Sequence, residues 1–116
     1  MPSENRTTME RRVFERFASS FPAKFKDTRE DYGANVYLTN ASGKGIRLLT
    51  KKPLHFNDEI TVEVKLPDKG EPMAIQGQVV WAKNKEQNLW DVGLRFHDIS
   101  LMHISRLYRA ATGNEP

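Results

Sequence analysis

The stretch ITVEVKL, residues 60–66, alternates apolar and polar side chains at every position. Its apolar side chains would lie together on one face of an extended chain: Ile60, Val62, Val64 and Leu66. A period of two residues is typical of a β-strand with one buried face and one face in water. The stretch therefore predicts a half-buried strand within a larger sheet.

The same period recurs on both sides of this stretch, between segments rich in glycine, asparagine, aspartate and proline. Strands are predicted at residues 21–25, 35–39, 46–50, 60–66, 73–82 and 90–96. Within the fifth strand we expect Ile75, Val79 and Trp81 on one face, and we expect KNKEQN, residues 83–88, to be a polar turn. Short, regularly spaced strands with no helices between them predict a small antiparallel barrel or sandwich.

After Phe96 the apolar period changes from two residues to that of a helix. The apolar positions that follow this helical spacing are Leu101, Ile104, Leu107, Tyr108 and Ala111. Asp98 or Ser100 can cap the start, and Gly113 stands where a helix often ends. The sequence thus predicts an all-β fold with one amphipathic helix at its C-terminus.

The composition narrows the class of protein. The chain has 116 residues, which suits one domain, and its 18 basic and 15 acidic residues give a net charge of only +3. It contains no cysteine, which excludes disulfides, thiolate metal sites and a cysteine nucleophile. No apolar run approaches the roughly 20 residues of a membrane span, and no signal peptide stands at the N-terminus. We expect a cytoplasmic protein without a membrane span.

The residues that catalysis requires do not form a recognisable set. His55, His97 and His103 lack the spacing of metal ligands, and no serine stands in a nucleophile-elbow context. The paired carboxylates occur in predicted turns, where solvated charge is the ordinary explanation. We therefore expect no enzyme, no metal and no cofactor.

Arginines crowd the N-terminal stretch, where RRVFERF occupies residues 11–17. Arg12 and Arg16 form an R-x-x-x-R pattern, which by itself also fits a solvated basic tail. The guanidinium group is a planar fork of donors that matches phosphate oxygens and the O6/N7 edge of guanine. Lys44 and Arg47 stand further along the chain and would add positive potential if they converge with this cluster.

A second motif follows 24 residues after Arg16, where NASGKG carries an N-x-S-x-x-G pattern at Asn40, Ser42 and Gly45. The two motifs in this order resemble the PilZ domain, a family that binds the bacterial second messenger cyclic di-GMP. GQVVWA and WDVGLRF, at 77–82 and 90–96, are similar to the later strand pair of that family. ISLMHISRLYRAA, at 99–111, is similar to its C-terminal helix.

The resemblance implies a six-stranded antiparallel barrel and a division of the chain. It implies a flexible leader at 1–10 and a PilZ domain at 11–112. Within that domain it implies a flexible arm at 11–20, the barrel at 21–97 and the C-terminal helix at 99–111.

The resemblance also implies a ligand site. Arg12 and Arg16 would contact the phosphates and guanine edges of cyclic di-GMP from the arm. Asn40, Ser42 and Gly45 would line the barrel surface on the other side of the ligand. Trp81 either stacks on a guanine, as an aromatic does in some members near this point, or is a core residue.

Arg11 bears on ligand stoichiometry. In the family, a basic residue directly before the R-x-x-x-R motif accompanies a ligand bound as a self-stacked pair. The resemblance therefore implies two cyclic di-GMP molecules per chain. It also implies an unidentified downstream protein partner in motility, exopolysaccharide or biofilm control.

Two other functions remain open from the residues alone. A small β-barrel that binds single-stranded nucleic acid would also use a basic arm and an exposed tryptophan. Against it, the net charge is small and no strand alternates lysine with aromatic residues, so we expect no nucleic acid as a partner. A PilZ-like adaptor that binds proteins without any nucleotide is the other alternative, although such members typically lack the arginine motif.

Overall fold

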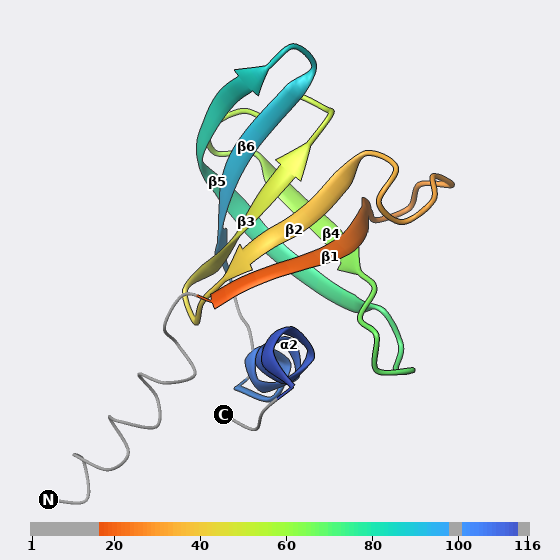
Figure 1. The fold of residues 1–116 in the computed structure, drawn as a ribbon. Coiled ribbons are helices and arrows are strands. Elements are labelled where there is room, and N and C mark those ends of the chain that lie inside the picture. The colour runs from red at the N-terminus through yellow and green to blue at the C-terminus, as the bar shows by residue number, and fades with distance from the viewer. Residues whose placement is uncertain (1–16, 98–100, 114–116) are drawn as a thin grey trace, which may run out of the picture.

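The computed structural model describes residues 17–97 and 101–113. Six strands and one helix follow one another in this part of the chain (Figure 1). They are β1 (Phe17–Phe25), β2 (Val36–Ala41), β3 (Gly45–Thr50), β4 (Glu59–Val64), β5 (Met73–Glu86), β6 (Leu89–Phe96) and α2 (Leu101–Thr112). The predicted all-β fold with a C-terminal helix is confirmed.

The strands close into an antiparallel barrel in the order β1-β2-β3-β6-β5-β4. Four of the pairings join consecutive strands: β1 with β2, β2 with β3, β4 with β5, and β5 with β6. The pairings of β3 with β6 and of β1 with β4 join strands distant in sequence. Closure gives each of the six described strands a neighbour on both sides, which is how small β-domains avoid edge-to-edge association.

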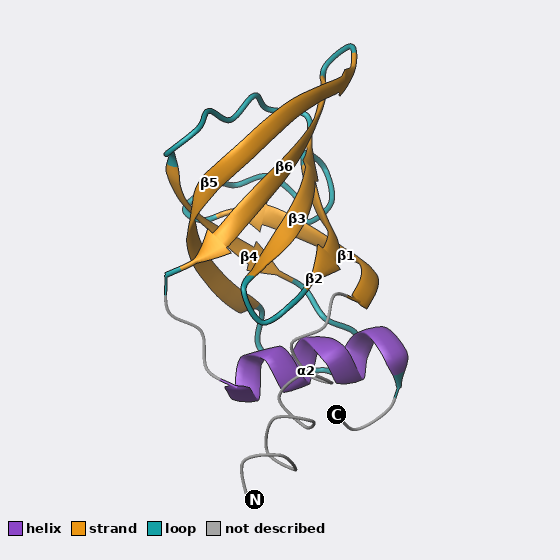
Figure 2. Ribbon diagram, turned by 90° about the vertical axis from the view of Figure 1, so that its left-hand side faces the viewer, coloured by secondary structure: helices purple, strands orange, loops and turns teal. Residues whose placement is uncertain are grey.

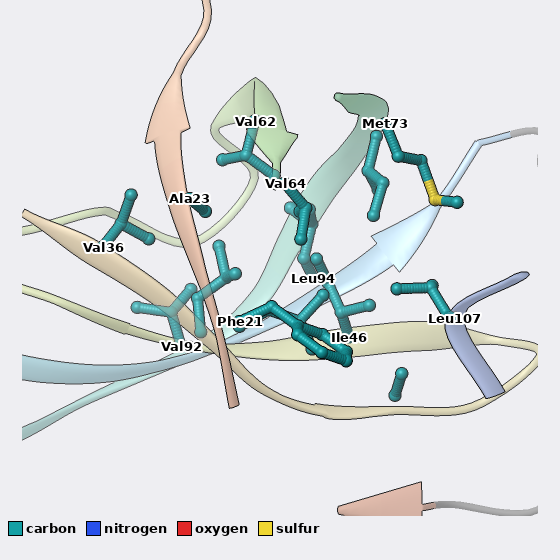
Figure 3. Packing of buried hydrophobic residues seen from close by; sticks show 14 of the residues in the cluster. Phe21, Ala23, Val36, Ile46, Val62, Val64, Met73, Val92, Leu94 and Leu107 are labelled. Carbon is teal, nitrogen blue, oxygen red and sulfur yellow. The ribbon is translucent and has the colours of Figure 1, made fainter. Parts of the chain in front are cut away.

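The apolar face of each strand points into the barrel, as the period of two residues predicts. Figure 3 shows side chains of the strands converging there, Phe21, Ile46, Val62, Met73 and Val92 among them. All of these side chains are buried. Burial of apolar surface, at about 25 cal/mol per Å², is the main source of stability for such a core.

Helix α2 lies across one end of the barrel (Figure 2). Ile104 and Leu107, one helical turn apart, are fully buried, and Leu107 reaches into the core cluster (Figure 3). On the same helix Met102 is 81% exposed, which marks the side that faces water. The amphipathic pattern of the sequence thus corresponds to a helix with one face packed against the end of the barrel and the other face in water.

A polar contact holds α2 against the connection between β4 and β5. The Nε and Nη2 groups of Arg106 donate to the two carboxylate oxygens of Asp68, at 2.6 and 2.9 Å. A further N–H of Arg106 donates to the Glu71 carbonyl oxygen at 2.7 Å. Hydrogen bonds from Arg106 and from the Gly70 amide hold the pKa of Asp68 well below its usual range.

The end of α2 follows the prediction. The helix stops at Thr112, and Gly113 adopts a φ of 78°, a left-handed conformation that glycine reaches without steric cost. Its N–H donates to the Arg109 carbonyl oxygen at 2.7 Å. The predicted capping residues Asp98 and Ser100 lie outside the described residues. In the described part of the chain, no helix has the length and apolar character needed to cross a bilayer.

Several strand boundaries differ from the prediction, and the two largest differences, of four residues each, are at the start of β1 and the end of β5. β1 begins at Phe17, so the backbone of 17–20 belongs to the barrel and not to the arm predicted at 11–20. β5 runs to Glu86, so most of the predicted turn at 83–88 is strand. In both segments, backbone pairing with the neighbouring strand forms the ladder whatever the side chains are. Residues 83–86 are also polar and exposed, so they carry no apolar period.

Candidate ligand-binding site

Four β-bulges interrupt the regular pairing of the described strands, and one of them, between Asn84 and Glu86, lies near the tip of the β5–β6 hairpin. The other three concern the residues discussed below. One lies in the pairing of β1 with β2, between Ala18 and Phe21, and one in that of β2 with β3, between Leu38 and Asn40. The third lies between Val79 and Trp81, where β5 pairs with β6. A bulge adds one residue to a strand and changes which side chains point outward, and bulges are over-represented beside functional sites.

The third bulge decides the position of Trp81. Val79 pairs with Leu94, but Trp81 pairs with Gly93, so one extra residue separates them on β5. Trp81 therefore leaves the inward face and is 38% exposed on the outside of the barrel. The expectation that it shares a face with Ile75 and Val79 was wrong, because unbroken alternation in a sequence does not reveal a bulge.

One row of residues crosses four adjacent strands on the outside of the barrel. Asn40 on β2 pairs with Arg47 on β3, Arg47 pairs with Gly93 on β6, and Gly93 pairs with Trp81 on β5. At the β1 end of this row, Ala18 pairs with Asn40. The fold thus places two predicted site residues that are far apart in the sequence, Asn40 and Trp81, in one row with Arg47 and Gly93 between them.

Gly93 is a part of this row that the sequence analysis missed. It stands between Arg47 and Trp81, and a Cβ at this position would overlap the Nε1, Cε2 and Cδ1 atoms of the Trp81 indole. The indole therefore lies directly against the backbone of β6. Gly93 is buried by this contact although it faces outward.

Gly93→Ala should displace the Trp81 indole while the barrel stays folded, because the colliding atoms belong to a side chain on the outside of the barrel that is 38% exposed and can turn toward solvent. We expect the free energy of unfolding to change by no more than about 1 kcal/mol. Indole N–H resonances and fluorescence of Trp81, recorded with Trp90→Phe in both proteins, measure the displacement. An unchanged Trp81 signal in a folded variant would show that the indole does not rest on Gly93.

Arg47 and Asp91 form a bidentate ion pair beside the row. The Nε of Arg47 donates to Oδ1 of Asp91 at 2.8 Å, and Nη2 donates to Oδ2. The Asp91 side chain is only 9% exposed, whereas that of Arg47 is 43% exposed. Hydrogen bonds from Arg47 lower the pKa of Asp91 although burial opposes this, and Lys85 and Lys83 add to the effect. The carboxylate is therefore ionised at neutral pH.

Trp81 packs with the same arginine. The Arg47 Cζ lies 5.7 Å from the centroid of the Trp81 ring, within the range of a cation–π contact. The guanidinium of Arg47 is thus held at one edge by Asp91 and lies over the ring of Trp81. From the sequence, Arg47 was predicted only as a source of positive potential. Its partner Asp91 is 44 residues away, so the ion pair has no local signal in the sequence.

The N-x-S-x-x-G motif forms the tight turn between β2 and β3. The Ser42 N–H donates to the Gly45 carbonyl oxygen at 2.9 Å, and the Lys44 N–H donates to the Ser42 Oγ at 3.2 Å. A Cβ on Gly45 would collide with the Leu94 carbonyl oxygen, so only glycine allows β3 to lie this close to β6. Gly45 thus has a structural role in addition to any contact with a ligand.

Two hollows on this outer surface meet at Arg47, and we call them together the groove. The first has a volume of about 210 Å³, and its lining includes Ser42, Lys44, Gly45, Arg47, Trp81, Gly93 and Arg95. The second has a volume of about 200 Å³, and its lining includes Asn40, Arg47, Lys85 and Asp91. Cations outnumber the one carboxylate among these residues, so the groove suits an anionic ligand.

The predicted site residues in the described part of the chain all line the groove: Asn40, Ser42, Gly45 and Trp81. The predicted arginines Arg11, Arg12 and Arg16 lie outside the described residues. Arg16 is bonded to Phe17, however, and Phe17 pairs with Ala41, the neighbour of Ser42. The chain that carries the arginines therefore joins the barrel beside the N-x-S-x-x-G turn.

The described residues thus form a small closed antiparallel barrel with a cationic groove and an exposed tryptophan on its outer face. Comparison with known families matches residues 10–112 to the PilZ domain, nearly the whole chain. The protein belongs to the PilZ domain family, which binds cyclic di-GMP. No curated protein matches the chain.

Proposed function

We propose that this protein is a cyclic di-GMP receptor that holds its ligand in the groove, between Arg12 and Arg16 on one side and the barrel surface on the other. The observation that carries the proposal is the convergence of Asn40, Ser42 and Trp81 around one groove. These residues come from β2, the turn after it and β5. A closed barrel without the bulge in β5 would not place Trp81 on this outer surface.

The chemistry of the groove suits this ligand. Cyclic di-GMP carries two phosphates and two guanines, so its site needs cations, donors for the guanine edges and a surface for stacking. Lys44 and Arg95 supply positive charge in the first hollow, and Trp81 supplies a partly exposed aromatic face. Asn40 lines the second hollow and can supply amide groups for a guanine edge.

Signalling would follow from contacts between the ligand and the arm. The arm joins β1 beside the β2–β3 turn, so a ligand that binds both would fix the arm against this side of the barrel. The ligand favours that arrangement by its higher affinity for it. A downstream protein in the cytoplasm would read the changed surface, and motility, exopolysaccharide synthesis or biofilm formation would be the output.

Calorimetric titration with cyclic di-GMP tests the proposal, with GTP and cyclic di-AMP as controls for nucleotide class and base. We expect binding of cyclic di-GMP alone at micromolar protein, with two ligand molecules per chain because Arg11 precedes the R-x-x-x-R motif. Saturation at one molecule per chain would show that Arg11 does not set a stoichiometry of two, and the proposed receptor function would stand. Absence of binding would overturn the receptor itself.

The two alternative functions give different results in the same assay. A binder of single strands would take an oligonucleotide with an affinity that falls steeply with salt, and cyclic di-GMP would not displace it. An adaptor would bind neither ligand. Full displacement of any bound oligonucleotide by cyclic di-GMP would instead support the receptor.

A further inference from the structure

The geometry points to Arg47 as a residue that reads the guanine edge of the ligand, with Asp91 as the residue that positions it. This inference rests on the proposed function, since it assigns a specificity residue within the same groove. Neither residue belongs to the R-x-x-x-R or N-x-S-x-x-G motif, and both lie on strands that form the wall of the barrel.

Arg47 is at the centre of the groove. It lines both hollows and also a third, which Trp81, Lys83 and Asp91 share with it. A ligand large enough to span two hollows would therefore pass over its guanidinium. With 43% of its side chain exposed, Arg47 can be reached from solvent without moving another residue.

The ion pair leaves one side of the guanidinium available for a ligand. A guanidinium has five N–H donors, and the two bonds to Asp91 use one on Nε and one on Nη2. The two on Nη1 and the second on Nη2 lie on the edges turned away from Asp91. Nη1 and Nη2 together form a second fork, which has the geometry for a bidentate contact.

Guanine suits this second fork better than adenine does. Guanine presents two neighbouring acceptors, O6 and N7, whereas adenine presents the N7 acceptor beside an N6 donor that opposes an arginine N–H. Trp81 lies under the same guanidinium, so a base stacked on its exposed part would meet Arg47 at the base edge. Arg47 would thus distinguish cyclic di-GMP from cyclic di-AMP.

Asp91 has two opposing effects on a ligand. It holds the plane of the Arg47 guanidinium, which favours a bidentate contact with guanine. Its negative charge also lowers the positive potential of the groove, which disfavours the phosphates of any dinucleotide. Loss of this charge should therefore reduce the preference for cyclic di-GMP over cyclic di-AMP, because only cyclic di-GMP loses the favourable effect.

The test measures the affinities of the full chain and its variants for cyclic di-GMP and cyclic di-AMP by calorimetry or ligand competition. Arg47→Ala should weaken cyclic di-GMP binding roughly 5- to 150-fold, the value of one bidentate contact, and change cyclic di-AMP binding much less. Arg47→Lys should lose most of the same selectivity, because an ammonium group keeps the charge but not the fork. Asp91→Asn should leave cyclic di-AMP binding unchanged or stronger and lower the ratio by which cyclic di-GMP is preferred.

Arg47→Ala leaves the Asp91 carboxylate without its arginine, and this could destabilise the barrel. The double variant Arg47→Ala/Asp91→Ala removes both charges and should show the same loss of selectivity. Arg29→Ala is the matched control, since Arg29 is an exposed arginine in the β1–β2 connection and lines none of the three hollows. Its affinities should equal those of the wild type.

The outcomes separate this inference from the receptor. If the wild type binds cyclic di-GMP selectively and folded Arg47 variants keep that selectivity, the role of Arg47 is wrong and the receptor stands. Equal weakening of both dinucleotides would make Arg47 a phosphate contact and would also overturn the inference. If the wild type binds no cyclic di-GMP, the proposed receptor function is wrong, and the role of Arg47 that rests on it is wrong as well.

Discussion

Replacing both Arg12 and Arg16 with alanine should weaken cyclic di-GMP binding roughly 30-fold at the least. A bidentate arginine contact is worth about 1–3 kcal/mol, and two independent contacts add to about 2–6 kcal/mol. Since about 1.4 kcal/mol corresponds to a tenfold change in affinity, the upper part of this range removes detectable binding. Each single variant should lose roughly 5- to 150-fold by the same reasoning.

The variants should fold like the wild type, because both arginines precede Phe17, where β1 begins. Thermal unfolding without ligand checks this, and the melting temperatures should agree. Arg6→Ala is the matched control, an arginine of the same N-terminal stretch that stands outside the motif. Wild-type affinity in the folded double variant would show that the R-x-x-x-R motif does not contact the ligand.

Leu107→Ala should lower the free energy of unfolding by about 2–5 kcal/mol, the usual cost of truncating a buried leucine. The Leu107 side chain is fully buried where α2 closes the end of the barrel. Its loss removes apolar contacts and leaves a cavity between the helix and the strands. For a domain of this size the typical total stability is about 5–15 kcal/mol, so the loss would be a large fraction of it.

Met102→Ala provides the control on the same helix, because Met102 is 81% exposed. It should change the free energy of unfolding by no more than about 0.5 kcal/mol. Urea denaturation followed by circular dichroism measures both variants. Equal stability of Leu107→Ala and Met102→Ala would mean that α2 does not contribute to the core.

The core could be predicted from the sequence to a large extent. Val62 and Val64 alternate with polar residues, and Ile104 and Leu107 recur at helical spacing, so each element shows which of its faces is buried. Such periods report how side chains are arranged around their own backbone, and this arrangement is local. The ends of β1 and β5 were missed because backbone pairing continues where the apolar period stops.

The site could be predicted only in part. Asn40, Ser42 and Gly45 were found through their spacing after the R-x-x-x-R motif, and all of them line the groove. Gly93 and Asp91 were missed, since each matters through contacts with residues on other strands. The sequence contains no local signal for such contacts.

The sequence by itself determined the strands, the closing helix and the two motifs, because these depend on period and spacing along one segment. Tertiary structure alone decided that Trp81 lies outside the barrel and that Arg47 is held by Asp91. The first depends on a bulge in the pairing of β5 with β6, and the second on the pairing of β3 with β6. Register between strands depends on which side chains become buried when the strands pair and on the turns that join them, so a single segment does not reveal it.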